Sequence, residues 1–298
     1  MRVAAHQLVD LFEGTSMSNN HPMWDRVARA RSFLFVPGNR HERFEKAARS
    51  GADAVILDLE DGVAPPDKPA AREAIAREWA KVKAVGIPVI VRLNALSTAY
   101  GPEDLAWART LDAPAAVMLP KAEGAEALER VHDALKVPVL PLIESAAGYA
   151  ALSAVAQARG VSRLFLGHID FMADTGLVCG DDEAEVAPLR FAMAMATRAA
   201  RLAAPVDGVT IQINDPERLR RDMQRGIRFG FGGKMCIHPS QVAVIHEACR
   251  PSADELNWAR KVLAADEASG GAAVQVDGRL VDLPVVLQAR RTLARAAA

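Results

Sequence analysis

The feature that most constrains the fold is a repeated alternation of short apolar runs with longer amphipathic segments, which starts at Arg31. Runs of about 4–8 apolar residues separated by helical periodicity are typical of βα units around a parallel sheet. Eight runs can be counted: Ser32–Val36, Ala54–Leu59, Pro88–Leu93, Ala115–Leu119, Pro138–Ile143, Arg163–Leu166, Val206–Ile211 and Gly232–Ile237. Most are apolar almost throughout, which indicates strands buried on both faces. The alternation therefore predicts an α/β protein with a closed (β/α)₈ barrel.

The main alternative for this alternation is a doubly wound open sheet with helices on both faces. A dinucleotide-binding sheet of that kind would carry a G-x-G-x-x-G turn after its first strand. Here the first run leads into Val36-Pro37-Gly38-Asn39-Arg40, which lacks that pattern. The closed barrel is therefore favoured.

Three regions are expected along the chain. Residues 1–30 are polar and irregular, and they indicate a loose arm or the stretch around an alternative translation start at Met17. Residues 31–251 hold the eight units of the barrel. Residues 252–298 are expected to form a small C-terminal helical extension: the spacing Ser252-Ala253-Asp254-Glu255 predicts a capping box, and a final helix follows Pro284.

Charge and composition exclude several classes of function. The formal net charge is -1 and the Lys and Arg residues are scattered, so no basic surface for nucleic acid is indicated. No apolar run approaches the roughly 18 residues that span a membrane, and no signal-type apolar segment is apparent. Cys179, Cys236 and Cys249 are too few for a disulfide framework and suit a reducing compartment. We therefore expect a cytoplasmic protein that acts on a small molecule.

Polar residues that follow the apolar runs are the candidate site, because the C-terminal strand ends form the active face of a βα barrel. Glu144 follows the fifth run and Asp170 follows the sixth, so their carboxylates are expected to converge. Two carboxylates with water and substrate oxygens are a natural ligand set for Mg²⁺. The alternative is that one or both carboxylates cap the helices that follow.

Arg92 ends a wholly apolar run, and its guanidinium is shaped to contact a carboxylate or an enolate with two donors. Glu60 and Asp61 follow the second run, close to Asp58, and support of Arg92 and of metal-bound water is one reading of this acidic group. A buried ion pair between Arg92 and Glu60 or Asp61, or a simple capping loop, is the other reading.

Lys121 and His168 follow the fourth and sixth runs. Lys121 is a candidate to bind a substrate carboxylate or phosphate, and a Schiff base is the weaker option because a converging acidic pair argues for metal. His168 is a candidate to orient substrate, although a single His near a strand end is more often a structural residue.

With these residues in place, the sequence resembles the citrate lyase beta-subunit-like family of CoA-thioester lyases, over roughly residues 31–295. The resemblance is carried by short stretches that occur in order: Arg31–Asn39, Leu57–Val63, Val91–Asn94, Leu119–Lys121, Ile143–Ser145, Gly167–Phe171, Gly230–Lys234, Ile237–Gln241 and Gly278–Pro284. Each stretch alone is weak, and together they are specific.

The resemblance implies a TIM barrel, a homotrimer or larger homo-oligomer, Mg²⁺ on Glu144 and Asp170, and Arg92 at a thioester enolate. It also implies that Asp282 enters the site of a neighbouring subunit as a general acid/base; a helix cap before Pro284 is the alternative. Arg40, Lys46 and Lys68 are candidates to contact CoA phosphates, with ordinary solvated charges as the alternative.

The activity implied is the retro-Claisen cleavage of a 3-hydroxyacyl-CoA to acetyl-CoA and a 2-oxo acid. Many relatives carry a second acidic residue just before the metal aspartate, where this chain has Gly167-His168-Ile169-Asp170. This form favours citramalyl-CoA or malyl-CoA over citryl-CoA as substrate. Competing hypotheses are a malyl-CoA-type thioesterase, a metal-dependent pyruvate aldolase on the same scaffold, and a non-catalytic assembly subunit.

Overall fold

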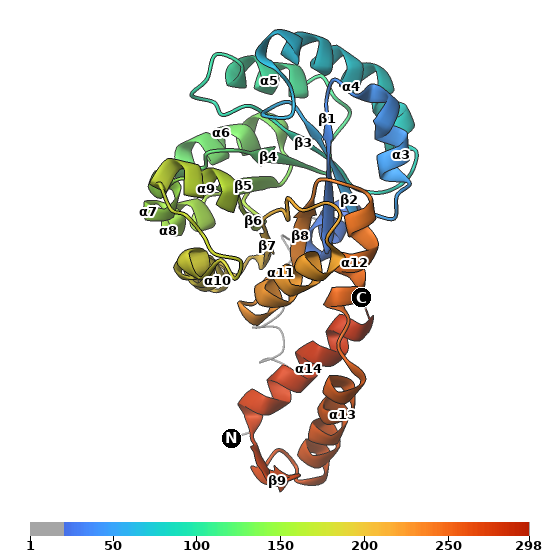
Figure 1. Cartoon of the computed structure of the whole chain (residues 1–298), viewed down its shortest axis with the longest axis vertical. Coiled ribbons are helices and arrows are strands. Elements are labelled where there is room, and N and C mark those ends of the chain that lie inside the picture. The colour runs from blue at the N-terminus through green and yellow to red at the C-terminus, as the bar shows by residue number, and fades with distance from the viewer. Residues whose placement is uncertain (1–20, 298) are drawn as a thin grey trace. The chain divides into compact units, whose positions relative to one another are not determined.

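A computed structural model describes residues 21–297 of the chain (Figure 1). Its internal contacts divide it into two compact units, Met1–Ile245 and His246–Ala298. The division falls inside a helix, a few residues before the expected boundary at 251/252. Each unit has its own buried apolar cluster.

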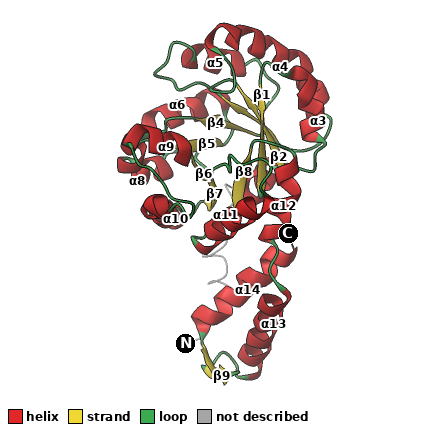
Figure 2. Cartoon of the chain, in the orientation of Figure 1, coloured by secondary structure: helices red, strands yellow, loops and turns green. Residues whose placement is uncertain are grey.

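The first unit is a closed barrel of parallel strands in the order β1-β2-β3-β4-β5-β6-β7-β8, which confirms the predicted TIM-barrel fold (Figures 1 and 2). The strands are β1 (Ser32–Pro37), β2 (Ala54–Asp58), β3 (Val89–Arg92), β4 (Ala116–Leu119), β5 (Val139–Ile143), β6 (Arg163–Leu166), β7 (Ala203–Asp207) and β8 (Gly233–Cys236). The barrel closes where Phe33 of β1 pairs with Met235 of β8.

One helix, α2, precedes the first strand, and the others follow the strands and form the outer layer. They are α2 (Pro22–Arg29), α3 (Phe44–Ala48), α4 (Lys68–Lys83), α5 (Gly101–Ala108), α6 (Ala125–Leu135), α7 (Ala146–Ala150), α8 (Leu152–Gln157), α9 (His168–Thr175), α10 (Ala187–Ala199), α11 (Pro216–Arg228) and α12 (Ser240–Cys249). Short 3₁₀ helices occupy His41–Arg43, Pro65–Asp67 and Ala184–Val186. Asp215 caps α11 by accepting a hydrogen bond from the Arg218 amide, as its position before Pro216 predicts.

The seventh strand differs from its prediction. Val206–Ile211 was expected, whereas β7 is Ala203–Asp207 and pairs with β6 from Ala203 onward. After Asp207, the carbonyls of Gly208 and Thr210 accept hydrogen bonds from the buried side chains of Lys234 and Gln241. Residues 209–211, with the apolar Val209 and Ile211, therefore form a loop at the mouth of the barrel and not the end of a strand.

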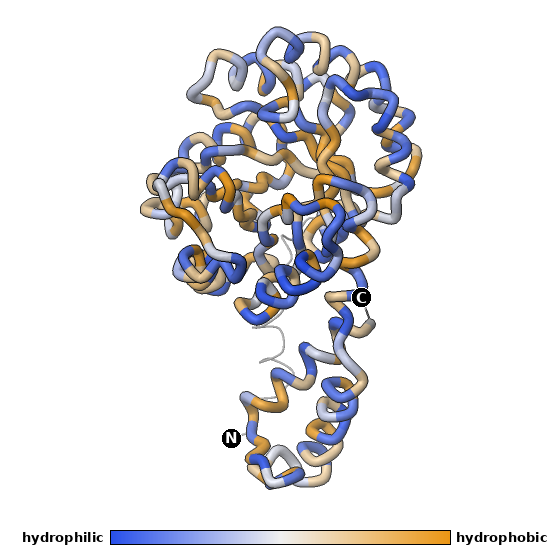
Figure 3. The backbone as a smooth tube through the Cα atoms, in the orientation of Figure 1, coloured by the Kyte–Doolittle hydropathy of each residue, from blue (hydrophilic) through white to orange (hydrophobic). Residues whose placement is uncertain are grey.

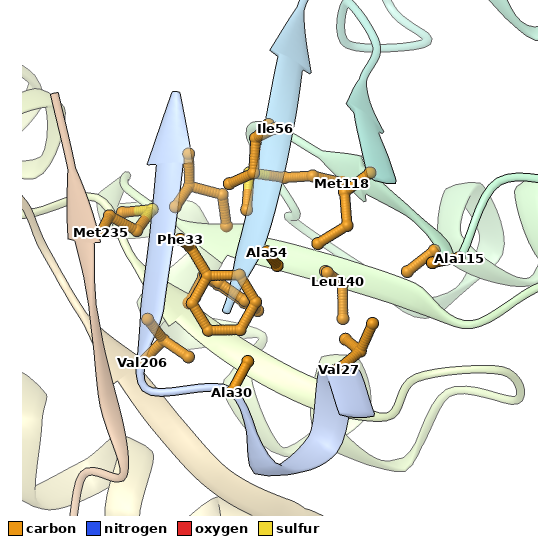
Figure 4. Packing of buried hydrophobic residues seen from close by; sticks show 14 residues of the cluster. Val27, Ala30, Phe33, Ala54, Ile56, Ala115, Met118, Leu140, Val206 and Met235 are labelled. Carbon is orange, nitrogen blue, oxygen red and sulfur yellow. The ribbon is translucent and has the colours of Figure 1, made fainter. Parts of the chain in front are cut away.

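Buried side chains from all eight strands fill the barrel interior, and Phe33 and Phe165 meet edge to face with ring centroids 4.9 Å apart (Figure 4). Helix α2 closes this core, because Val27 belongs to the same cluster and Arg163 Nη1 donates to the Val27 and Ala30 carbonyls. The expectation of an irregular arm is therefore wrong for residues 22–29. Residues 1–20, with Met17, lie outside the described part of the chain.

The second unit contains α13 (Ala253–Ala268), the antiparallel strands β9 (Val274–Val276) and β10 (Arg279–Val281), and α14 (Leu283–Ala297). Ser252 and Glu255 form the predicted capping box at the start of α13. Val262, Val281 and Val286 are buried in the unit's own core. The extension is thus helical as predicted. The hairpin of β9 and β10 between its helices, which follows the glycines at 270 and 271, was not predicted.

Apolar residues concentrate along the barrel strands, whereas the helices alternate between polar and apolar positions (Figure 3). Within residues 21–297, no helix has the length and apolar character needed to cross a membrane.

Candidate active site

A cavity of about 410 Å³ opens at the C-terminal ends of the barrel strands. Its lining combines acidic and basic side chains with apolar ones: Phe35, Pro37, Asp58, Asp61, Gly62, Arg92, Leu142, Leu166, Gly167, His168, Ile169, Asp170, Val209, Ile211, Met235 and Ile237. This is the face that the sequence analysis selected, and Arg92, Asp61, His168 and Asp170 all reach it.

Arg92 is fixed by two buried carboxylates. Its Nε and Nη2 donate to the two oxygens of Asp58 at 2.6 and 2.7 Å, which is a bidentate pair. Its Nη1 lies 2.7 Å from Glu60 Oε2, and its guanidinium lies 4.7 Å from the centroid of the Phe35 ring. Arg92 therefore has the predicted ion pair with Glu60 and also lines the cavity.

Asp58 is a site residue to which the sequence analysis gave too little weight. Besides Arg92, its carboxylate accepts hydrogen bonds from the amides of Glu60 and Gly62, both at 2.9 Å. A Cβ on Gly62 would lie 2.4 Å from Asp58 Oδ2, so the turn needs glycine there. In the sequence, the only sign of this role is that three acidic residues lie within the four positions 58–61. In the structure, the first of them binds both Arg92 and the loop after β2.

Glu60 is buried, with an exposed fraction of 6%. Burial raises its pKa to about 7, although the neighbouring Arg92 guanidinium opposes that rise. Its Oε2 makes no hydrogen bond, although it lies within ion-pair distance of Arg92. Asp61, in contrast, is exposed and lines the cavity.

Glu144 directly follows β5 and is also buried, with an exposed fraction of 3%. Its Oε1 accepts a hydrogen bond of 2.7 Å from the backbone amide of Lys121, whose φ of 47° turns the chain toward it. Burial, and then repulsion from the Glu60 carboxylate, raises the pKa of Glu144 to about 8. A Cβ on Gly167 would lie 2.6 Å from Glu144 Cβ, so the next strand passes close beside it.

Asp170 lies in the first turn of α9 and lines the cavity. Burial, and then the Asp61 carboxylate, raises its pKa, and its charge contributes in turn to the raised pKa of Glu144. The predicted convergence of Glu144 and Asp170 on one metal ion stays a prediction, because Asp170 lines the cavity and Glu144 is buried beside it.

The donor set fits a hard divalent cation. Glu60 and Glu144 are buried carboxylates whose pKa values are raised, and the nearby guanidinium is already bound to Asp58 and Glu60. A cation among them would favour their ionised forms. Within residues 21–297 no cluster of three or more His, Cys, Asp or Glu side chains has metal-site spacing. The site offers two predicted ligands, the carboxylates of Glu144 and Asp170. Mg²⁺ accepts such a pair when water or substrate oxygens complete its coordination.

His168 is buried, with an exposed fraction of 3%, and lines the cavity. Its Nε2 lies 3.7 Å from Glu183 Oε1, and burial lowers its pKa to about 4, so the ring is neutral at pH 7. A Cβ on Gly208 would lie 2.0 Å from His168 Nδ1, so the ring fills the space that this glycine leaves.

Three predicted CoA contacts lie away from this cavity. Lys68 is wrong as a phosphate ligand: its buried ammonium donates to the carbonyls of Leu59 and Glu60 and to Asn94 Oδ1, each at 2.8 Å. Arg40 is exposed and donates to Glu42 at 2.7 Å. Lys46 lines a separate hollow of about 940 Å³ beside α3 and α4.

Lys121 is exposed, and its backbone contributes to the site through Glu144. Asp282 belongs to the second unit, where it lies between β10 and α14 and its carbonyl accepts from the Val286 amide. The structure does not place Asp282 relative to the cavity.

The chain forms a closed parallel barrel, and an arginine bound by carboxylates lies with two further carboxylates in the cavity at its mouth. These features are typical of TIM-barrel enzymes that bind a metal ion through carboxylates. The chain belongs to the HpcH/HpaI aldolase/citrate lyase family, whose model matches residues 31–239. A second model, C-C bond lyase of the TIM-barrel fold, matches residues 191–298.

Curated relatives cover nearly the whole chain. A citrate lyase subunit beta-like protein of Mycobacterium tuberculosis is 39% identical, covering 89% of this chain and 94% of its own. A (3S)-malyl-CoA thioesterase of Cereibacter sphaeroides is 32% identical, with 90% and 95% covered. The mitochondrial citramalyl-CoA lyase of Homo sapiens is 29% identical, with 94% and 88% covered.

Among solved structures, CitE from Mycobacterium tuberculosis in complex with magnesium, acetoacetate and coenzyme A superposes with a TM-score of 0.80. It is 36% identical, and the match covers 91% of this chain and 100% of that one. These likenesses confirm the membership of the citrate lyase beta-like group that the motifs indicated.

Proposed function

We propose that this protein is a Mg²⁺-dependent carbon–carbon lyase that cleaves a 3-hydroxyacyl-CoA to acetyl-CoA and a 2-oxo acid. The observation that carries the proposal is the buried Arg92, held by Asp58 and Glu60 at the mouth of the cavity. Relatives named as a citramalyl-CoA lyase, and as CitE bound to magnesium, acetoacetate and coenzyme A, support the same chemistry.

Glu144 and Asp170 would hold the metal, which when bound supplies Lewis acidity to the 3-hydroxyl and the neighbouring carboxylate of the substrate. The protein would contribute two carboxylates and leave the other positions to water and substrate. Glu144 is kept in place by the Lys121 amide, so one of its oxygens is fixed before metal arrives.

Arg92 would stabilise the thioester enolate that forms when the bond between C2 and C3 breaks. The electron pair of that bond becomes the enolate, while the 3-hydroxyl loses its proton and its carbon becomes the carbonyl of the 2-oxo acid. Charge that develops in a water-poor site is stabilised most by donors that are already oriented. The contacts of Arg92 with Asp58, Glu60 and Phe35 provide that orientation.

The proton is assigned to Asp282 of a second copy of the chain, acting as general acid/base on the hydroxyl and then on the enolate carbon. A site completed in this way requires a homo-oligomer, and we propose the homotrimer that the family resemblance implies. Asp61 would bind metal-bound water at the cavity wall, and Lys121 and His168 would position the substrate from the β4 and β6 sides. The CoA phosphates would reach Lys46, and Arg40 if its ion pair with Glu42 opens.

The test is product analysis with citramalyl-CoA, malyl-CoA and citryl-CoA in the presence of Mg²⁺. The proposal predicts that at least one thioester gives acetyl-CoA and a 2-oxo acid in equal amounts. Chelation of the metal should abolish both products. No turnover of any of the three would contradict the proposal.

A thioesterase is the second candidate, because a (3S)-malyl-CoA thioesterase is among the relatives that cover nearly the whole chain. The same assay separates the two activities. A thioesterase would release free CoA and malate from malyl-CoA without acetyl-CoA.

A further inference from the structure

The cavity has an apolar wall on the side of β7 and β8. Val209 and Ile211 come from the loop after β7, and Ile237 follows β8. Ile211 and Ile237 expose 56% and 38% of their surface, and both line the cavity. The acidic residues of the lining and Arg92 come from β2, the loop after it, β3 and α9, so no acidic or basic side chain of the lining comes from β7 or β8.

This wall is fixed from behind by a buried polar network. Lys234 Nζ donates to the Gly208 carbonyl at 2.6 Å, and Thr210 Oγ1 donates to Asp222 Oδ2 at 2.7 Å. The residues on either side of Val209 are therefore both anchored.

Gln241 joins the two loops of the wall. Its Nε2 donates to the Thr210 carbonyl at 2.8 Å, and its Oε1 accepts from the Ile237 amide at 2.9 Å. Gln241 exposes only 2% of its surface. The wall is thus a preformed surface, with the backbone atoms turned to the network and apolar side chains lining the cavity.

The charges of the cavity limit what can lie against this wall. Its described lining has three carboxylates, Asp58, Asp61 and Asp170, and one permanent cation, Arg92. Arg92 is already bound to Asp58 and Glu60. A second substrate carboxylate placed against this wall would therefore be desolvated without a cation of the cavity lining free to pair with it.

We propose that the Val209, Ile211 and Ile237 wall binds the substituent on C3 of the acyl group and selects a short, uncharged alkyl chain. This inference rests on the proposed lyase function and narrows it to substrates whose 2-oxo acid product carries an alkyl group. Gln241 is a positioning residue that sets the wall by holding its two loops together.

Binding of 2-oxo acids tests the proposal without turnover. Calorimetric titration of the full-length protein with Mg²⁺ present would compare pyruvate, 2-oxobutanoate and oxaloacetate. The alkyl acids are expected to bind about tenfold more tightly than oxaloacetate, because one or two buried methyl groups gain a few-fold each and an unpaired carboxylate loses more. Equal or tighter binding of oxaloacetate by the wild type would overturn the proposal.

Two variants with the same added charge sharpen the test. Ile237→Lys places a cation on the wall, whereas Val178→Lys places one on a side chain that is 87% exposed and does not line the cavity. The proposal predicts that only Ile237→Lys tightens oxaloacetate relative to pyruvate, by about tenfold. The same shift in both variants would show a general charge effect and would contradict a selective wall.

Gln241→Leu tests the positioning role. It removes both hydrogen bonds between the loops, so the preference for alkyl acids should fall to less than about threefold while Mg²⁺ affinity stays at the wild-type value. An unchanged preference in a folded Gln241→Leu protein would remove Gln241 from the account. If the alkyl preference holds while no CoA thioester is cleaved, the wall stands and the lyase function fails.

Discussion

At the scale of single residues, Arg92 shows what the sequence could and could not indicate. Its position at the end of a buried strand predicted a functional guanidinium or a buried ion pair, and the structure shows the ion pair and places the residue in the cavity lining. Asp58 and Lys68 were harder to place, because their roles depend on contacts with residues distant in sequence. Asp58 reaches Arg92, and Lys68 reaches Asn94.

Arg92→Lys is expected to lower kcat by about 100-fold or more with a smaller change in KM. A lysine cannot reproduce the bidentate contact with Asp58, so the charge that faces the enolate would lose its fixed orientation. Steady-state kinetics with the best thioester would measure this. A change in KM alone would mean that Arg92 serves binding and not the chemical step.

The raised pKa of Glu144 predicts how stability depends on pH in protein kept free of metal. Its folded pKa of about 8 lies above its ordinary value of 4.5, so the folded state holds a proton that the unfolded state has lost. The free energy of unfolding should therefore fall as pH rises from about 4.5 to 8. His168 acts in the opposite direction, because its folded pKa of about 4 lies below its ordinary value of 6.5. It makes the free energy of unfolding rise with pH between these two values and has no further effect above about pH 6.5.

Of these two groups, only Glu144 titrates between pH 6.5 and 8.5. The free energy of unfolding should fall by about 1–2 kcal/mol over this range. Urea unfolding with a chelator at both pH values would measure it, and Glu144→Gln should lose distinctly less. A wild type and a Glu144→Gln variant with the same pH dependence would contradict the assigned pKa.

At the scale of elements, the sequence predicted the barrel well because each strand is nearly continuous in apolar residues. The pattern failed where apolar residues serve the cavity and not the core, as in residues 209–211 after β7. It also failed at α2, where few apolar residues suffice because Arg163 binds the end of the helix.

Arg163→Met is expected to destabilise the barrel by about 3 kcal/mol. The arginine is 1% exposed, and its guanidinium donates to the carbonyls of Ala204, Val27 and Ala30, of which the last two would be left buried without donors. Equilibrium unfolding in urea would measure the change, with Arg159→Met, on a mostly exposed side chain, as control. Equal stability of the two variants would show that the carbonyls find other donors.

At the scale of the whole molecule, the chain is a barrel with the cavity and a separate helical unit that carries Asp282. Sequence resemblance assigned this aspartate to a neighbouring subunit, and no pattern in the residues themselves could do so, because the partner surface belongs to another copy. The assignment stays a prediction. Family membership and fold, in contrast, follow from the chain alone.

Complementation tests the shared site. Arg92→Ala and Asp282→Ala homo-oligomers should each be inactive, and a mixture that has exchanged subunits should regain a fraction of wild-type activity, because some sites then contain both residues. Mass spectrometry of mixed oligomers would confirm exchange. No recovery despite exchange would count against an aspartate supplied by a second copy.

The central claim is that Glu144 and Asp170 hold the Mg²⁺ on which cleavage depends, and calorimetric titration of Mg²⁺ tests it most directly. Asp174 offers a matched control, since it lies one turn beyond Asp170 on α9 and its carboxylate accepts from the Ala146 amide. The account predicts that wild type and Asp174→Ala bind one Mg²⁺ per chain with similar affinity, and that Glu144→Ala and Asp170→Ala bind it at least about tenfold more weakly. Wild-type affinity in both Glu144→Ala and Asp170→Ala would contradict it.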